Sequence, residues 1–159
     1  MVPVVPAAKA RPTAAEAAGV RREKFARLLL AGLFIGAGVN HFVSPEPYVW
    51  IMPPFLPWAL ALVYISGVAE IIGGIGLLFT RTRKIAAYGL IALLLAVFPA
   101  NIFGALQGTS VSGAIPPWLL WARLPFQAVL ILWVYYAGLR SSDPAAGIVH
   151  RQKSREHGP

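Results

Sequence analysis

Glu70 is the residue whose type and position most strongly suggest chemistry, because it interrupts a long apolar segment. It lies 12 residues after Trp58 and 11 residues before Arg81. If this segment is one helix across a bilayer, a rise of about 1.5 Å per residue places the carboxyl roughly 16–18 Å from either boundary. An ionisable side chain at that depth costs about 2.5–3.5 kcal/mol even on a lenient insertion scale. A carboxyl there needs a partner, or it stays protonated as a proton carrier would.

Arg123 and Gln127 are the candidate partners of Glu70. They are four residues apart in another apolar segment, so they share one helix face, roughly 7 and 13 Å below the outer surface. The axial offset between Glu70 and Arg123 is then about 10 Å, and both side chains lean outward, which makes a direct bridge marginal. A ladder from Glu70 through Gln127 to Arg123 is at least as plausible. A structural lock between helices and a functional site account for these residues equally well.

Three further polar residues, Asn40, His41 and Asn101, fall in the outer third of their segments, roughly 5–10 Å from the outer surface. A single histidine near a helix end is more often a capping or interfacial residue than a ligand. Here, however, three segments place polar side chains at one depth, with Glu70 beneath them and Tyr48 above in a proline-rich turn. The pattern predicts a polar cavity in the outer half, lined by His41, Glu70, Asn101, Arg123 and Gln127, with Asn40 and Tyr48 beside it.

Glycines and prolines indicate how the helices carrying these residues pack. Gly32 and Gly36 share a face of the first apolar segment, and Gly67 interrupts the second, so we expect close helix contacts there. Pro99 and Pro125 each remove a helix hydrogen bond in the outer half. Such freed backbone groups are tolerated at membrane depth where protein or water satisfies them.

The elements that must position these residues are membrane-spanning helices. The chain of 159 residues is 57% hydrophobic and only 13% charged, whereas soluble domains have roughly 45–50% apolar and about 25% charged residues. Apolar segments of the roughly 20 residues needed to cross a bilayer occur at 25–43, 58–80, 85–106 and 118–139. The sequence therefore predicts an all-α fold, an integral membrane four-helix bundle whose first partner is the lipid bilayer.

Basic residues predict the orientation of this bundle. Six lie before or at the start of the first segment, three lie between the second and third, and four follow the fourth, whereas the other two connections have none. Because short cytoplasmic loops hold the excess of Lys and Arg, both termini are expected to be cytoplasmic. We expect residues 1–20 to form a disordered leader, 21–140 the membrane domain and 141–159 a polar cytoplasmic tail. The net charge of +8 then reflects orientation and anionic lipid, with no nucleic-acid partner.

Several classes of site are excluded by the residue inventory. The chain has no cysteine, which removes thiol relays, iron–sulfur clusters and Cys-ligated zinc. His150 and His157 lie in the tail, so no pair of membrane histidines could hold a haem. No cluster of carboxylates and histidines offers a metal site. We therefore expect no metal and no intrinsic cofactor.

Six motifs in order along the chain resemble the DoxX family of small four-helix bacterial membrane proteins. They cover about 21–139 and are Gly38-Val39-Asn40-His41-Phe42, Pro47-Tyr48, Pro53-Pro54-Phe55-Leu56-Pro57, Ser66-Gly67-Val68-Ala69-Glu70-Ile71, Phe98-Pro99-Ala100-Asn101-Ile102 and Arg123-Leu124-Pro125-Phe126-Gln127. The family name derives from a subunit of a thiosulfate:quinone oxidoreductase, and relatives are described as redox-associated. The resemblance implies a multi-pass protein of the bacterial cytoplasmic (inner) membrane. Most members have no assigned reaction, and whether this chain is an enzyme stays open.

Two functions of different classes follow. In the first, the outer-half cavity binds or protonates a quinone-like small molecule, because polar groups that converge between apolar walls are typical of small-molecule pockets. In the second, the chain is a noncatalytic membrane subunit or scaffold that docks a soluble oxidoreductase partner through its cationic ends. A homo-oligomer is compatible with both.

Overall fold

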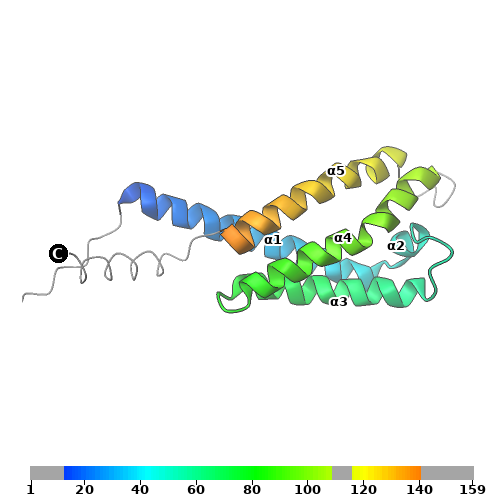
Figure 1. The fold of residues 1–159 in the computed structure, drawn as a ribbon, viewed down its shortest axis with the longest axis horizontal. Coiled ribbons are helices and arrows are strands. Elements are labelled where there is room, and N and C mark those ends of the chain that lie inside the picture. Colours follow the sequence, from blue (N-terminus) through cyan, green and yellow to red (C-terminus); the bar gives the residue numbers. More distant parts are fainter. Residues whose placement is uncertain (1–12, 109–115, 141–159) are drawn as a thin grey trace, which may run out of the picture.

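The computed structural model describes residues 13–108 and 116–140, which contain helices and no strand (Figure 1). The long helices are α1 (Ala14–Val43), α3 (Ala59–Leu78), α4 (Arg83–Gln107) and α5 (Pro117–Val134), and α5 continues into the π-helix η2 (Tyr135–Arg140). The short helix α2 (Glu46–Trp50) joins α1 to α3. Four helices are long and apolar enough to cross a membrane. The chain is thus an all-α four-helix bundle of a multi-pass membrane protein, as the hydropathy predicts.

The first helix is longer than predicted at its N-terminal end. Thr13 and Glu16 form a capping box, in which the Thr13 hydroxyl accepts from the Glu16 backbone N–H and the Glu16 carboxylate accepts from the Thr13 backbone N–H. Four alanines follow the cap between residues 14 and 18, and alanine is the strongest helix former. The prediction of a disordered leader over 1–20 is therefore wrong for 13–20. Residues 1–12 and the predicted tail at 141–159 lie outside the described residues.

The helices pack in the order α1, α3, α4, α5, and α1 contacts the far side of the bundle through η2. Figure 1 shows α4 and α5 rising away from α1 and α3 toward the end at which α2 lies. Large apolar side chains on every long helix face outward, among them Leu28, Ile65, Leu95 and Leu132. An apolar surface of this extent is typical of helices that cross a membrane.

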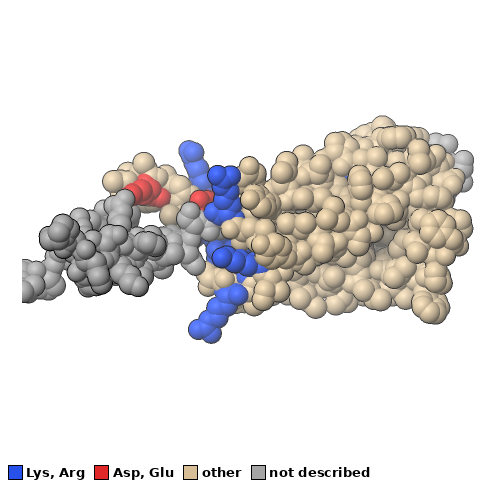
Figure 2. Space-filling view, viewed as in Figure 1, with Lys and Arg blue, Asp and Glu red and all other residues tan. Residues whose placement is uncertain are grey.

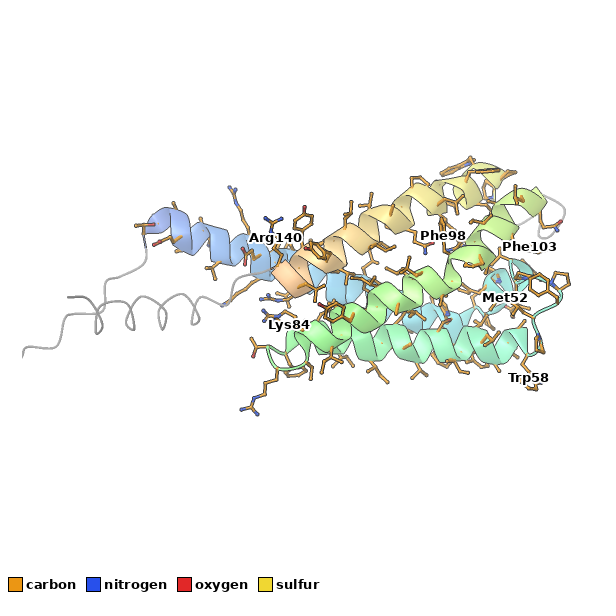
Figure 3. All side chains as sticks on the ribbon, in the orientation of Figure 1. Met52, Trp58, Lys84, Phe98, Phe103 and Arg140 are labelled. Carbon is orange, nitrogen blue, oxygen red and sulfur yellow. The ribbon has the colours of Figure 1, made fainter. Side chains whose placement is uncertain are left out.

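Basic side chains gather at one end of the bundle, as Figure 2 shows. This basic end is formed by the first half of α1, the turn between α3 and α4, and the end of η2, and it contains Arg21, Arg22, Lys24, Arg27, Arg81, Arg83, Lys84 and Arg140. The opposite end, called here the α2 end, has no Lys or Arg in the described stretch from Ser44 to Trp58. In Figure 3, Lys84 and Arg140 lie at the basic end, and Trp58 lies at the α2 end.

The core divides into two hydrophobic clusters along the bundle axis. The larger cluster lies toward the basic end and includes Phe34, Leu94 and Leu130. The smaller cluster lies at the α2 end and consists of Ile51, Ala105 and Leu120, with Leu124 packed against it. The Ile51 side chain sits where a Cβ on Gly104 would come within 2.6 Å of it, so the residue that follows α2 packs closely against α4.

A polar layer separates these two clusters. On α4, Asn101 lies between Leu94 of the larger cluster and Ala105 of the smaller one, and on α5, Gln127 lies between Leu124 and Leu130. Asn101 and Gln127 therefore lie at the level between the two apolar clusters.

Candidate functional site

His41 is the buried centre of the polar layer on α1, with 7% of its surface exposed. Its Nδ1 lies 2.9 Å from the Val63 carbonyl oxygen and 3.0 Å from the Ser66 hydroxyl. Because a carbonyl only accepts, Nδ1 carries a proton and donates it to Val63. The Ser66 hydroxyl donates to the same carbonyl at 2.8 Å. These contacts hold the ring on α3 and leave Nε2 as the free ring nitrogen.

Glu70 lies next to that free nitrogen. Its Oε2 is 3.8 Å from His41 Nε2, and its side chain is 13% exposed. The same Oε2 is buried and makes no hydrogen bond with any described residue. Nδ1 already holds one proton. A second proton shared by Nε2 and the carboxyl gives a neutral pair if it is on the carboxyl, or an imidazolium–carboxylate pair if it is on Nε2. The two groups are therefore arranged to hold or release one proton.

The direction of the helices explains why Glu70 faces His41. Side chains lean toward the N-terminus of their own helix, and α1 begins at the basic end whereas α3 begins at the α2 end. His41 therefore leans toward the membrane centre, and Glu70, one turn deeper than Ser66, leans up toward it. Arg123 is on α5, which begins at the α2 end like α3, so it leans away from Glu70.

Two glycines bring α1 and α3 close enough for this contact. A Cβ on Gly38 would lie 2.6 Å from the Gly67 carbonyl oxygen, and a Cβ on Gly67 would lie 2.8 Å from the His41 Cβ. The predicted contact at Gly67 is therefore confirmed, with Gly38 as its partner. The prediction for Gly32 and Gly36 is wrong within one chain, because a Cβ at either would meet nothing within 4 Å.

Tyr48, expected in a proline-rich turn above the polar residues, lies in the short helix α2 and covers the His41 ring. The two ring centres are 3.9 Å apart with the planes inclined at 36°. The Tyr48 hydroxyl accepts from Asn40 Nδ2 at 2.8 Å, and the Arg123 guanidinium carbon lies 5.9 Å from the centre of the Tyr48 ring, within cation–π range. We call Asn40, His41, Tyr48, Ser66, Glu70 and Arg123 the His41 cluster.

Asn101 and Gln127 form a second polar group, the Gln127 pair. Asn101 Nδ2 donates to Gln127 Oε1 at 2.9 Å, and Gln127 Nε2 donates to the Leu94 carbonyl oxygen. Pro99 has no backbone N–H, so the Leu95 carbonyl lacks its usual helix donor, and Leu94 is the residue just before it. Gln127 is 4% exposed, so this pair closes α5 onto the kinked part of α4.

The candidate residues thus divide between two groups. Asn40, His41, Tyr48, Glu70 and Arg123 belong to the His41 cluster, and Asn101 and Gln127 belong to the Gln127 pair. Between the two groups the described residues record no hydrogen bond or ion pair. The proposed ladder from Glu70 through Gln127 to Arg123 is therefore replaced by the contact of Glu70 with His41. That these side chains line a cavity for a ligand stays a prediction.

Ser66 and the Val63 carbonyl are the groups that sequence reasoning missed. Ser66 lies one turn before Glu70 on the same face of α3, which could have marked it as a neighbour. The Val63 carbonyl could not be identified in this way, because every residue has a backbone carbonyl. As for metals, no three His, Asp or Glu side chains in 13–108 and 116–140 gather closely enough to hold an ion.

Comparison with known proteins places the chain in a family. No curated protein and no solved structure matches the chain. The model of the family described as "Domain of unknown function (DUF8561)" matches residues 30–137, which include every residue of the His41 cluster and of the Gln127 pair. Because this match spans more than half of the sequence, the chain belongs to the DUF8561 family.

Proposed function

We propose that this protein is a DoxX-like, redox-associated protein of the bacterial cytoplasmic (inner) membrane that binds a quinone-like small molecule at the His41 cluster. The observation that carries the proposal is the buried Glu70 Oε2, which has no hydrogen-bond partner among the described residues. Leaving a buried carboxyl oxygen unpaired costs about 1–3 kcal/mol or more. A ligand that donates to this oxygen, or that exchanges a proton with it, offsets the cost.

The side chains around Glu70 suit the head group of a quinone. A quinone presents a flat ring with two carbonyl oxygens, which become hydroxyls when it is reduced. The Arg123 guanidinium and the Tyr48 hydroxyl can donate to a carbonyl, and the Glu70 carboxyl and His41 Nε2 can accept from a hydroxyl. The Tyr48 and His41 rings already lie against each other, with their centres 3.9 Å apart. A quinone ring would therefore pack on an outer face of this ring pair.

The resemblance to DoxX proteins supports the same class of ligand. The motifs that carry the resemblance include Asn40-His41, Pro47-Tyr48, Ser66 to Glu70 and Arg123, which together supply the His41 cluster. The basic end, which the positive-inside rule places in the cytoplasm, leaves the cluster in the outer half of the membrane. A lipophilic ring could reach this level from within the bilayer.

Quinone binding can be measured directly on the purified protein. A short-chain quinone is titrated into the detergent-solubilised chain while tryptophan fluorescence is followed, because Trp50 and Trp121 lie on the helices that carry Tyr48 and Arg123. We expect saturable quenching, with Glu70→Gln lowering the affinity at least about tenfold through loss of a charge-assisted hydrogen bond. The control is Glu46→Gln, an exposed carboxylate on α2, which should bind like the parent. Saturable binding that survives Glu70→Gln and Arg123→Ala together would sink the proposal.

A second candidate function is that of a noncatalytic subunit or scaffold for a soluble redox partner. It is favoured by the first turns of α1, which extend beyond the other helices in Figure 1 and present Arg21, Arg22 and Lys24 as exposed side chains. In this case a soluble oxidoreductase should copurify from native membranes and be released by high salt. Arg21→Glu with Arg22→Glu should abolish the copurification and leave quinone titration unchanged. Loss of quinone binding in that variant would argue against the scaffold.

A further inference from the structure

A lipid-facing groove between α3 and α4 lies outside the proposed quinone site. Its volume is about 650 Å³, within the roughly 300–1,000 Å³ usual for small-molecule sites. Gly73 and Gly76 line it where α3 packs closely against Leu90 and Ala86 of α4. Gly89, Ile72, Phe79 and Ile85 also line it, the last three as flanking side chains. The flanking side chains are more than half exposed, so the groove opens to the surroundings of the bundle.

The length of the groove matches one leaflet of a bilayer. On α3 it runs from Ala69 to Phe79, a rise of roughly 15 Å at 1.5 Å per residue. This is about half of a 30 Å hydrocarbon core. The groove therefore extends from near the membrane centre to the basic end, along the path that an acyl chain of that leaflet follows.

The end of the groove carries positive charge. Thr82 lines the groove at the turn between α3 and α4, and the neighbouring Arg81 and Lys84 are exposed. The sequence contains no acidic residue between Glu70 and Asp143, so no carboxylate on the turn or on α4 neutralises these cations. Arg81 and Lys84 therefore lie where the apolar groove ends, at the level of an anionic head group at the membrane surface.

We propose that the groove holds one acyl chain of an anionic phospholipid of the cytoplasmic leaflet, with the lipid phosphate at Arg81 and Lys84. The apolar lining accommodates the chain, and Gly89 leaves open space for it because a Cβ there would meet nothing within 4 Å. The two cations select the charge of the head group. A second copy of this protein is the poorer occupant. A symmetric contact through this face would bring two identical cationic turns together, whereas the phosphate of a lipid neutralises one.

Gly89→Leu tests the apolar part of this site. A Cβ at Gly89 meets nothing within 4 Å, so the leucine side chain fills the groove without displacing a neighbour. Gly36→Leu is the matched control, because Gly36 is equally open but lies on α1. Native mass spectrometry in detergent compares phosphatidylglycerol, which is anionic, with phosphatidylcholine, which is not. We expect the parent and Gly36→Leu to bind phosphatidylglycerol at least about tenfold more tightly than phosphatidylcholine, because two cations are each worth about fivefold. Gly89→Leu should lose this preference, because its leucine fills the groove that holds the acyl chain.

Arg81→Gln and Lys84→Gln test the charged part. Each should weaken phosphatidylglycerol binding about fivefold and leave phosphatidylcholine binding unchanged. The double variant Arg21→Gln with Arg22→Gln removes two charges from α1, as many as Arg81→Gln and Lys84→Gln together, and should have little effect on binding of either lipid. Equal binding of the two lipids by the parent, or equal losses in Gly36→Leu and Gly89→Leu, would overturn the proposal. So would a Gly89→Leu variant that keeps its lipid preference but no longer self-associates, because the groove would then bind a second copy.

Discussion

The His41 cluster and the Gln127 pair occupy the same polar layer, but their hydrogen bonding differs. In the Gln127 pair, the Gln127 amide donates to a backbone carbonyl and its oxygen accepts from Asn101. In the His41 cluster, Glu70 Oε2 is buried without a hydrogen bond in the described structure. A satisfied buried group stabilises the helix contact that contains it, whereas an unsatisfied one costs free energy. We therefore assign stability to the Gln127 pair and ligand or proton binding to the His41 cluster.

The helix contacts beneath the two groups differ as well. α1 and α3 meet backbone to backbone at Gly38 and Gly67, so the His41 cluster rests on a contact with no spare space. α4 and α5 carry Pro99 and Pro125 at the level of the Gln127 pair. Hydrogen bonds made by the Gln127 side chain link the two helices there.

The largest effect is expected from Gly67→Ala. The added methyl carbon would lie 2.8 Å from the His41 Cβ and 2.9 Å from the Gly38 carbonyl oxygen, so α1 and α3 must move apart. Overpacking costs about 1–3 kcal/mol, and the separation also moves His41 away from Glu70. Thermal unfolding in detergent, followed by circular dichroism, should show a large fall in Tm together with loss of quinone binding. Gly36→Ala, which meets nothing within 4 Å, should unfold like the parent.

Gln127→Leu should have the next largest effect, and only on stability. It removes the hydrogen bonds to Leu94 and from Asn101, and such bonds in membrane helices are worth on average about 0.6 kcal/mol each. Quinone titration should stay within about twofold of the parent. Adding Asn101→Leu should recover part of the lost stability, because both partners are then apolar. A large loss of quinone affinity in Gln127→Leu would instead indicate that the Gln127 pair and the His41 cluster form one binding site.

Tyr48→Phe should have a smaller effect, of about 0.5–1 kcal/mol. The substitution removes the hydroxyl that accepts from Asn40 and keeps the ring against His41. Quinone affinity should fall by a few-fold if the hydroxyl donates to the ligand. Asn40→Ala removes the same hydrogen bond from the other side, and it should reproduce the change in stability without the change in affinity. Equal affinity losses in both variants would instead indicate that Asn40 positions Tyr48.

Much of the fold could be predicted because lipid selects helices by length and hydropathy alone. The ends of α3 and α4 fall within two residues of the predicted spans. The start of α1 could not be obtained in this way, because residues 13–20 are helical through a capping box and alanines and not through hydropathy. The short helix α2 depends on prolines at its first turn and on the packing of Ile51, which is tertiary information.

The sequence predicts the depth of each candidate residue along its helix, but it does not predict which of these residues contact one another. A rise of about 1.5 Å per residue locates each polar residue along the membrane normal, and this was enough to collect the residues of one layer. Which of them meet depends on the rotation and order of the helices. α1 packs on α3, so His41 and not Gln127 contacts Glu70. The Val63 carbonyl that holds His41 has no counterpart in the sequence pattern.

The smallest change in stability is expected from Glu70→Gln, and this makes it the decisive variant. Glutamine keeps the size of the side chain and removes the ionisable group, whose placement in a membrane helix costs about 2.5–3.5 kcal/mol on the insertion scale. With no hydrogen bond to lose at Oε2, Tm should be unchanged or slightly higher, in contrast to Gln127→Leu. By the proposal, the affinity for quinone nevertheless falls at least about tenfold. If Glu70→Gln instead unfolds as readily as Gln127→Leu, the carboxyl is a structural lock like the Gln127 pair, and the assignment of different roles to the two groups fails.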